Sequence, residues 1–139
     1  MIEEVVIQSS SGPAKLILYN PEFGDDALLE FYSVRVEDDG LVATTRVDAD
    51  SALTKGLDEL FADLATNWRG WDGEKVGGSI DDNLFLSCHA DKLGHTFIAV
   101  TLSQSGNWTV EGKLQLDAAQ LEPLAKQLKR FFHPALNAI

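Results

Sequence analysis

Hydrophobic and polar residues alternate along two long stretches of this 139-residue chain, and a segment with helical periodicity follows each stretch. Alternation sends every second side chain to the same face, which is typical of a strand with one buried face. Residues that favour turns separate the alternating runs. Eight strands are therefore predicted, at residues 3–8, 14–19, 28–37, 41–48, 74–79, 84–90, 95–102 and 107–116.

The first helical segment carries apolar residues on one face from Leu53 to Trp68. Asp50 or Ser51 is the expected N-cap, because short polar side chains bond the free amides of a first helical turn. Gly70 is the expected stop, since glycine commonly follows the last turn of a helix.

The second helical segment has a stripe of leucine and phenylalanine that His133 and Pro134 end. The stripe consists of Leu121, Leu124, Leu128, Phe131 and Phe132. Asp117 could cap this helix, but Pro123 would then lie beyond the first turn and remove a backbone hydrogen bond. The start is therefore placed near Ala119.

The predicted elements follow the order of four strands, a helix, four strands and a helix. Residues 31–64 resemble residues 97–131, so the halves 1–68 and 69–139 are interpreted as a degenerate internal repeat. Recurrent hairpin and helix chemistry without common ancestry is the alternative. This order predicts an α+β fold, with an antiparallel sheet built from two β-β-β-β-α units with a pseudo-two-fold repeat, and both helices on one face. Residues 1–139 are expected to form a single domain.

Two hairpins can be paired from their alternation, because residues that share a buried face must have the same parity. The first predicts a three-residue loop at 92–94, with Asp91 opposite His95. The second predicts Leu102 opposite Trp108. The outer face of the first hairpin would then carry Phe85, Ser87, His89, Asp91, His95 and Phe97.

Charge is the compositional feature that bears on partners. The chain has 11 basic and 22 acidic side chains, a formal net charge of −11. Residues 1–66 hold 4 basic and 14 acidic side chains, while residues 67–139 hold 7 and 8. Such acidity repels phosphate backbones, so no nucleic-acid partner is expected. The acidic half predicts either a solubility feature or a surface for a basic protein partner, with Asp38 and Asp39 as candidate binding residues.

Composition also bears on the compartment. The chain opens with Glu3 and Glu4 where a secretory signal needs basic residues, and no run of about 18 apolar residues follows. Its single cysteine, Cys88, lies in an apolar strand pattern, which fits a reducing environment. A cytoplasmic protein without a membrane segment is expected, and the oligomeric state stays open.

The most distinctive segment, W-R-G-W-D-G-E-K, begins at Trp68 and joins the two halves. In a structural interpretation, Trp68 and Trp71 anchor the helix end on the sheet, and Arg69 pairs with an acidic neighbour, Asp72 or Glu74. In a functional interpretation, Trp71 is partly exposed beside Arg69, because these residue types are enriched at the centres of interfaces.

This segment and the strand hairpin after it are similar to a family of small uncharacterised bacterial proteins. The matching hairpin residues are His89, Asp91, Gly94 and His95. The likeness covers most of residues 67–132 and implies a compact domain without a recorded activity. Gly77 and Gly78 depart from the family, where a bulky aromatic or apolar residue is expected. This departure argues against an aromatic site at the start of that strand.

His89, Asp91 and His95 are expected on one face of the hairpin tip. A solvated turn with outward imidazoles is one interpretation, and a weak zinc or pH-linked site is the other. The spacing matches no known metal signature, so no metal is predicted.

No arrangement of nucleophile and base is predicted either. Residues 9–11 are serines before a Gly-Pro pair, which is ordinary turn composition. Residues 73–78 are rich in glycine but lack the following helix that a phosphate loop needs. No catalytic residue and no cofactor are predicted, and a catalytic role is less favoured than binding.

Three functions stay open. The leading one is a non-catalytic binding module, of the immunity type or a regulatory adaptor, whose acidic surface meets a basic protein. The second is a small-ligand-binding protein or an enzyme that uses the outer face of the sheet around His89 and His95. Further residues of that face would be Phe85, Phe97 and Arg35. The third rests on fold analogy with single-strand nucleic-acid binders of the whirly type, whose need for a basic groove is not met.

Overall fold

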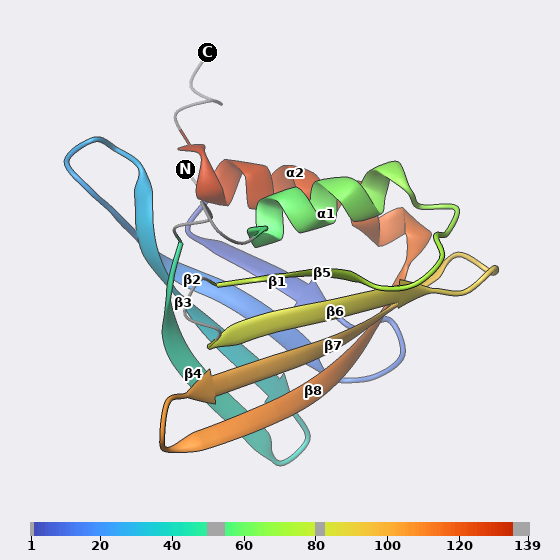
Figure 1. Ribbon diagram of the computed structural model, residues 1–139, viewed down its shortest axis with the longest axis horizontal. Helices are drawn as coiled ribbons and strands as arrows, with labels where there is room; N and C mark the ends of the chain where they lie inside the picture. Colours follow the sequence, from blue (N-terminus) through green and yellow to red (C-terminus); the bar gives the residue numbers. More distant parts are fainter. Residues whose placement is uncertain (1, 50–54, 80–82, 135–139) are drawn as a thin grey trace.

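The computed structural model describes residues 2–49, 55–79 and 83–134, and its strands form two four-stranded antiparallel sheets, each followed by a helix (Figure 1). The first sheet contains β1 (Glu4–Gln8), β2 (Lys15–Phe23), β3 (Leu29–Asp38) and β4 (Leu41–Asp48), and α1 (Leu57–Thr66) follows it. The second contains β5 (Lys75–Gly78), β6 (Leu84–Ala90), β7 (His95–Gln104) and β8 (Trp108–Asp117), and α2 (Ala118–Phe132) follows it. The predicted α+β class and its two repeated units are confirmed, although the strands form two sheets instead of one.

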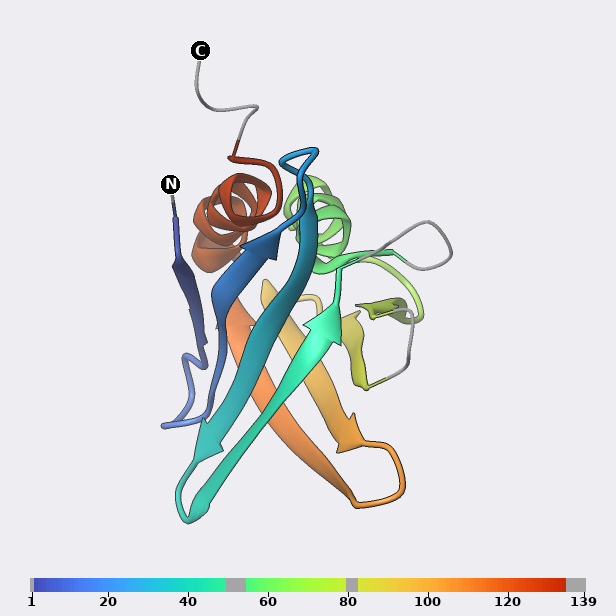
Figure 2. The same ribbon diagram turned by 90° about the vertical axis from the view of Figure 1, so that its left-hand side faces the viewer.

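The two helices lie next to each other, above one end of the sheets (Figure 2). The turn between β3 and β4 and the turn between β7 and β8 lie at the opposite end. Both helices are thus on the same side of the molecule, as predicted from the element order.

Apolar side chains from both sheets and both helices form one buried cluster. Tyr32 of β3 is 1% exposed, and its ring meets Phe131 and Phe132 of α2 edge-on, at centroid distances of 5.9 and 5.3 Å. Burial raises the pKa of the Tyr32 hydroxyl, which keeps this side chain neutral. Edge-on aromatic pairs stabilise a core beyond the area that they bury. The second helix is therefore fixed on a strand of the first half.

The hairpin of β6 and β7 has the predicted register. His89 lies opposite Phe97, and the Asp91 amide donates to the His95 carbonyl at 3.1 Å. Gly94 supplies the left-handed residue of the three-residue loop, with a φ of 86°. The outer face carries the predicted side chains, with His89 exposed and His95 and Phe97 partly exposed.

The hairpin of β7 and β8 is paired differently from the prediction, which was wrong by two residues. Leu102 lies opposite Val110, and Gln104 lies opposite Trp108. The three loop residues are 105–107, with Gly106 at a φ of 78°. Parity fixes which residues share a face, but a shift by two residues preserves parity, so the turn decides the register.

Two sets of hydrogen bonds join the sheets at their edges. After β1, the Ser10 amide donates to the Gln115 carbonyl of β8 at 2.7 Å, and the Ser9 hydroxyl accepts from the Gln115 amide at 3.1 Å. Before β6, the Asn83 side chain donates to the Arg46 carbonyl of β4 at 2.9 Å. Serines that the sequence assigns to an ordinary turn thus hold one sheet against the other.

Helix α1 is shorter than its hydrophobic stripe predicts. It begins at Leu57, after Gly56, and ends at Thr66 with Asn67 as its C-cap instead of near Gly70. The Asn67 side chain donates to the Asp63 carbonyl at 2.9 Å, which satisfies a carbonyl of the last turn. The expected N-caps and the first apolar residue of the stripe, Asp50, Ser51 and Leu53, lie outside the described residues.

Helix α2 begins at Ala118 with Asp117 as its N-cap, so the start predicted near Ala119 is wrong by one residue. Gln120 accepts from the Asp117 amide at 2.9 Å and donates to the Gln8 carbonyl of β1 at 3.0 Å. Pro123 lies inside the helix. The capping interactions of Asp117 and Gln120 therefore outweigh the hydrogen bond that Pro123 removes.

The glycine pair of β5 lies where the chain passes close to α1 and β6. A Cβ on Gly77 would be 2.9 Å from the Lys55 carbonyl oxygen and 3.1 Å from Leu60 Cδ2, and one on Gly78 would clash with the Leu84 carbonyl. The Gly78 amide donates to the Lys55 carbonyl at 3.0 Å. This close approach leaves no space for the bulky residue that the family resemblance implies here.

Candidate functional site

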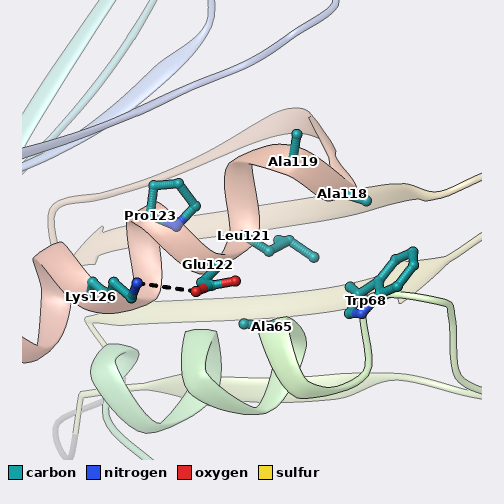
Figure 3. Close-up of a pocket in the computed structure, with 8 residues that line it drawn as sticks. All are labelled: Ala65, Trp68, Ala118, Ala119, Leu121, Glu122, Pro123 and Lys126. Carbon is teal, nitrogen blue, oxygen red and sulfur yellow. Dashed lines mark ion pairs between the residues drawn. The ribbon is translucent and has the colours of Figure 1, made fainter.

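The two helices run antiparallel and leave a groove between them on the outer side of the molecule. One hollow of this groove, of about 580 Å³, lies between the end of α1 and the first turns of α2 (Figure 3). A second hollow, of about 490 Å³, lies between the start of α1 and the end of α2. Both hollows are lined by Ala65, Glu122 and Lys126, so they form one groove along the helix pair, which we call the helix groove.

Trp68 lies at one end of the helix groove and is 49% exposed. Its ring stands at the end of α1, opposite Ala118 and Ala119 of α2 (Figure 3). The Arg69 guanidinium lies over the Trp68 ring, 5.0 Å from its centroid. A half-exposed tryptophan beside alanines is an apolar site that a partner side chain can cover.

Charged side chains line the other end of the helix groove. Asp58 and Glu59 come from α1, and Lys129 comes from α2. The His133 ring bonds Asp58 across the groove at 2.8 Å. One wall of this end is therefore acidic and the facing wall is basic.

The W-R-G-W-D-G-E-K segment meets the tip of the β6–β7 hairpin, which the sequence did not predict. The two line a separate hollow of about 350 Å³. Its lining residues are Arg69, Gly70, Trp71, Asp72, Ala90, Asp91 and Lys92. Gly70, with a φ of 121°, turns the chain here, and a Cβ on it would be 3.4 Å from the Asp91 carbonyl oxygen. This hollow mixes two cations with two anions.

The two tryptophans of the segment have different environments. Trp71 is partly buried and packs against the core, and the Lys75 ammonium lies 5.8 Å from its ring centroid. Trp68 is the more exposed of the two, and Trp71 keeps a partly exposed surface beside Arg69 in the hollow, so it combines the packing of the structural interpretation with the partial exposure of the functional one. The turn at Gly70 explains the difference, because it directs Trp71 back to the second sheet.

The predicted pairing of Arg69 with Asp72 or Glu74 is not found among the residues that the structure describes. Arg69 covers Trp68 instead, and Glu74 accepts from the Ser87 hydroxyl at 2.7 Å.

Asp91 and His95 form a hydrogen-bonded pair at the hairpin tip, and His95 Nε2 also lies 4.0 Å from Asp117 Oδ1. The Asp91 carboxylate accepts from the Leu93 amide at 2.8 Å and the His95 amide at 3.0 Å, and it bonds His95 Nδ1 at 2.8 Å. The bond from the His95 amide is the main cause that lowers the pKa of Asp91. His89 stacks on Phe97 instead, with ring centroids 5.1 Å apart. The Asp91–His95 pair therefore holds the conformation of the hairpin loop.

Within residues 2–49, 55–79 and 83–134, no group of three or more His, Cys, Asp or Glu side chains is placed to hold a metal ion. The alternative interpretation of the histidines as a zinc site thus gains no support. Cys88 points to the core, as predicted, and burial raises the pKa of its thiol to about 12. A thiol with this pKa is a poor nucleophile at neutral pH.

Arg35 is not on the same surface as Phe85 and Phe97, contrary to the prediction. It lies on the outer face of the first sheet, with its guanidinium 4.8 Å from the Tyr19 ring centroid. Arg46 lies on the same face, 3.8 Å from the Phe31 ring centroid. The prediction failed because alternation shows that a side chain lies on the outer face of its strand, but it does not show to which of the two sheets that strand belongs.

Acidic side chains of the first half lie at the two turns that flank β3. Asp38 and Asp39 are exposed in the β3–β4 turn, near Val42, which is 67% exposed. Asp25 and Asp26 are exposed in the β2–β3 turn, near a leucine that is 62% exposed, Leu28. Four exposed acidic side chains of this half therefore lie in turns that also carry exposed aliphatic side chains.

The helix groove is the feature that sequence reasoning missed. Its apolar part is lined largely by alanines on the outer faces of the helices, whereas the hydrophobic stripes that predict helices consist of leucine and phenylalanine. The signal was present as a set of alanines at helical spacing: Ala62 and Ala65 on α1, and Ala118, Ala119 and Ala125 on α2.

These features define a small α+β domain of two repeated units whose helix pair carries an open groove. Residues 7–135 match the model of a family described as a family of unknown function (DUF6228), and the chain belongs to this family. The match extends well beyond the segment that carries the resemblance. No curated protein and no solved structure matches the chain. Among the described residues, no helix is both long and apolar enough to cross a membrane.

Proposed function

We propose that this chain is a non-catalytic binding module, of the immunity type or a regulatory adaptor, that associates with a basic protein through its first half. The observation that supports this proposal is the placement of exposed acidic pairs beside exposed aliphatic side chains at both turns that flank β3. Acidic groups speed the approach of a basic partner, and an apolar contact at their centre slows its release.

The β3–β4 turn is the stronger of the two surfaces. The Asp38 carboxylate accepts from the Asp39 amide at 2.8 Å, which fixes the turn, and Asp39 stays exposed. Val42 presents 67% of its surface next to them. The arginines of the same sheet are engaged elsewhere, since Arg46 pairs with Glu22 at 2.7 Å and Arg35 covers Tyr19. Lys15 and Lys113 line a small hollow together with Asp38, so the proposal relies mainly on the exposed Asp39 for charge that a partner can meet.

The proposal also includes a cytoplasmic location in a bacterium. The free, buried thiol of Cys88 agrees with a reducing compartment. The bacterial origin is taken from the family resemblance of the W-R-G-W-D-G-E-K segment.

The test is capture from a bacterial lysate at low salt, followed by measured binding of the purified partner. Asp38→Lys with Asp39→Lys is expected to raise the Kd by at least about tenfold, because two attractive contacts become repulsive. The matched control reverses two exposed acids of the second half, Asp72→Lys and Glu111→Lys. A change below about threefold is expected for the control. Equal losses from both double variants, or capture of no basic protein, would contradict the proposal.

The alternative, a small-ligand site or an enzyme around His89 and His95, stays a prediction. His89 is exposed, and its stacking on Phe97 provides a flat aromatic surface for a planar ligand. A thermal-shift screen with nucleotides and metabolites tests it. A ligand whose stabilisation is lost in His89→Ala would favour this alternative over the protein partner.

A further inference from the structure

The helix groove has a charged end and an apolar end. Each end complements the same end of a second copy that faces it. At one end, α1 carries Glu59 and α2 carries Lys129. At the other end, Trp68 follows α1, and α2 begins with Ala118 and Ala119. Each end thus presents one member of a pair on α1 and the other member on α2.

A two-fold axis along the groove brings these pairs together between two copies. This rotation places α1 of one copy over α2 of the other and keeps each position along the groove unchanged. Glu59 of one copy then faces Lys129 of the second copy, and the reverse contact forms at the same time. Trp68 of each copy covers the alanines at the start of the other α2. A two-fold axis across the groove would instead place α1 over α1 and set Glu59 over Trp68.

The charge of the whole molecule favours this face over others. The chain has a formal net charge of −11, so most pairs of surfaces on two copies repel each other. The helix groove is more balanced, since the basic side chains of Lys126 and Lys129 stand beside its acidic ones. Lys126 also pairs with Glu122 at 3.1 Å (Figure 3). Two copies can therefore meet here without repulsion between their β3–β4 turns, which lie at the opposite end of the molecule, and the acidic β2–β3 turn stands beside the helix pair (Figure 2).

We propose that two copies of this chain form a symmetric dimer through the helix groove, with α1 of each copy packed over α2 of the other. The inference is tested independently of the basic partner proposed above, because the test of that partner uses Asp38 and Asp39 of the β3–β4 turn, which lies at the opposite end of the molecule from the helices (Figure 2). The face is about 20 Å wide and about 15 Å long at α1 and about 22 Å long at α2, from the lengths of the two helices. This size is at the low end for specific interfaces, so a Kd in the micromolar range is expected.

The first experiment measures the mass of the wild-type chain by sedimentation from about 1 μM to 1 mM, the range in which a small interface dissociates. The wild type is expected to change from monomer to dimer. Trp68→Ala is expected to raise the dimer Kd by at least about tenfold, because the substitution removes two tryptophan contacts from a symmetric dimer, one from each copy. Phe85→Ala, which removes an aromatic ring that is 40% exposed on the second sheet, is the matched control and leaves the Kd unchanged.

The second experiment tests the orientation with two charge variants. Glu59→Lys sets two ammonium groups opposite each other at each contact of its own dimer, and Lys129→Glu sets two carboxylates opposite each other. Each variant alone is expected to dimerise at least about tenfold more weakly than the wild type. An equal mixture of the two variants is expected to regain dimers, because both contacts of the mixed pair are attractive. Circular dichroism checks that each variant is folded.

A wild type that stays monomeric at the highest concentration overturns the proposal and leaves the groove to another occupant, such as an amphipathic helix of a different protein. A wild-type dimer whose two charge variants do not recover on mixing also overturns it, since α1 would then not lie over α2 of the other copy. A dimer that Phe85→Ala weakens as much as Trp68→Ala places the interface elsewhere. None of these outcomes bears on the basic partner, whose test uses Asp38 and Asp39.

Discussion

At the scale of single residues, Asp91 does more for the fold than its place at a hairpin tip suggests. Its carboxylate accepts from two backbone amides and bonds the His95 ring within a three-residue loop. A carboxylate with several donors is stabilised in its charged form, and the bond from the His95 amide is the main cause that lowers the pKa of Asp91. The hairpin is therefore stabilised while Asp91 is ionised.

This linkage predicts how Asp91→Asn depends on pH. Because the folded pKa is below the unfolded value of about 3.9, the contribution is fully present above about pH 4 and is lost as pH falls through the folded pKa. Asp91→Asn is expected to lower Tm by a few degrees at neutral pH. The difference from the wild type should shrink as pH falls below about 4 and reach zero below the folded pKa, where the aspartate is protonated in both states. Thermal unfolding followed by circular dichroism measures it.

Asp72→Asn is the control for this prediction. Asp72 is exposed, and its carboxylate accepts no hydrogen bond within the part of the chain that the structure describes. Its replacement should leave Tm unchanged at every pH. A Tm difference for Asp91→Asn that stays constant down to about pH 2 would show that the loss comes from side-chain shape and not from the charged carboxylate.

Residue-scale prediction from the sequence succeeded where the cause is local. The outward direction of His89 and His95 follows from alternation within one hairpin, and the structure confirms it. The exposure of Trp68 and the partial burial of Trp71 depend on the turn at Gly70, whose φ of 121° the sequence does not specify. Local pattern thus predicts a face, and only the path of the chain decides which tryptophan reaches solvent.

At the scale of elements, β5 can lie close to α1 and β6 because Gly77 and Gly78 have no side chains. Gly77 approaches the Lys55 carbonyl and Leu60 of α1, and Gly78 donates to the same carbonyl at 3.0 Å. The Asp63 side chain of α1 adds a second link, since it pairs with Lys75 of β5 at 3.0 Å. The edge of the second sheet is therefore held directly under α1.

Gly77→Ala is expected to destabilise the protein by about 1–3 kcal/mol, because its Cβ would force β5 and α1 apart. Urea unfolding of the variant and the wild type measures the difference. Gly12→Ala is the matched control, since Gly12 is exposed and a Cβ there meets nothing within 4 Å. The control should be neutral or more stable by up to about 1 kcal/mol, because alanine restricts the unfolded chain. Equal free energies for the two variants would mean that the close approach is relieved at no cost.

Helix stripes predicted both helices but not their limits. The stripe of α1 continues past the residues that are helical at its C-terminal end, because Asn67 closes the helix before Trp68. For α2, the proline rule favoured a later start than Asp117 and Gln120 produce. Capping interactions decide such limits, and they involve partners as distant as the Gln8 carbonyl. The helix groove was missed at this scale too, since alanines add little to a hydrophobic stripe even where they recur at helical spacing.

At the scale of the whole molecule, the chain divides its strands between two sheets and joins their edges by side-chain hydrogen bonds. Alternation predicts that each strand has one buried face, but it does not predict whether that face packs against a helix or against another sheet. The repeat of four strands and a helix was therefore predictable. The facing of the two sheets was not, because the residues that join them, such as Ser9 and Asn83, are isolated polar residues in the sequence.

The join between β1 and β8 leads to the last prediction, which concerns Ser9→Ala. Ser9 is 6% exposed, and its hydroxyl accepts from the Gln115 amide at 3.1 Å. Removing the hydroxyl leaves this amide without its acceptor in a partly buried place, so a loss of about 1–2 kcal/mol in the free energy of unfolding is expected. Ser105→Ala, in the exposed β7–β8 turn, should change the free energy of unfolding by less than about 0.5 kcal/mol.

Hydrogen exchange at the Gln115 amide separates the loss of this hydrogen bond from a general loss of packing. If the bond joins the sheets, the Gln115 amide should exchange faster in Ser9→Ala than global unfolding of the variant would allow. The reason is that the edges of the sheets then open before the core unfolds. If Gln115 keeps its protection while the whole protein is destabilised, Ser9 acts through packing, and the sheets are held together by their apolar faces.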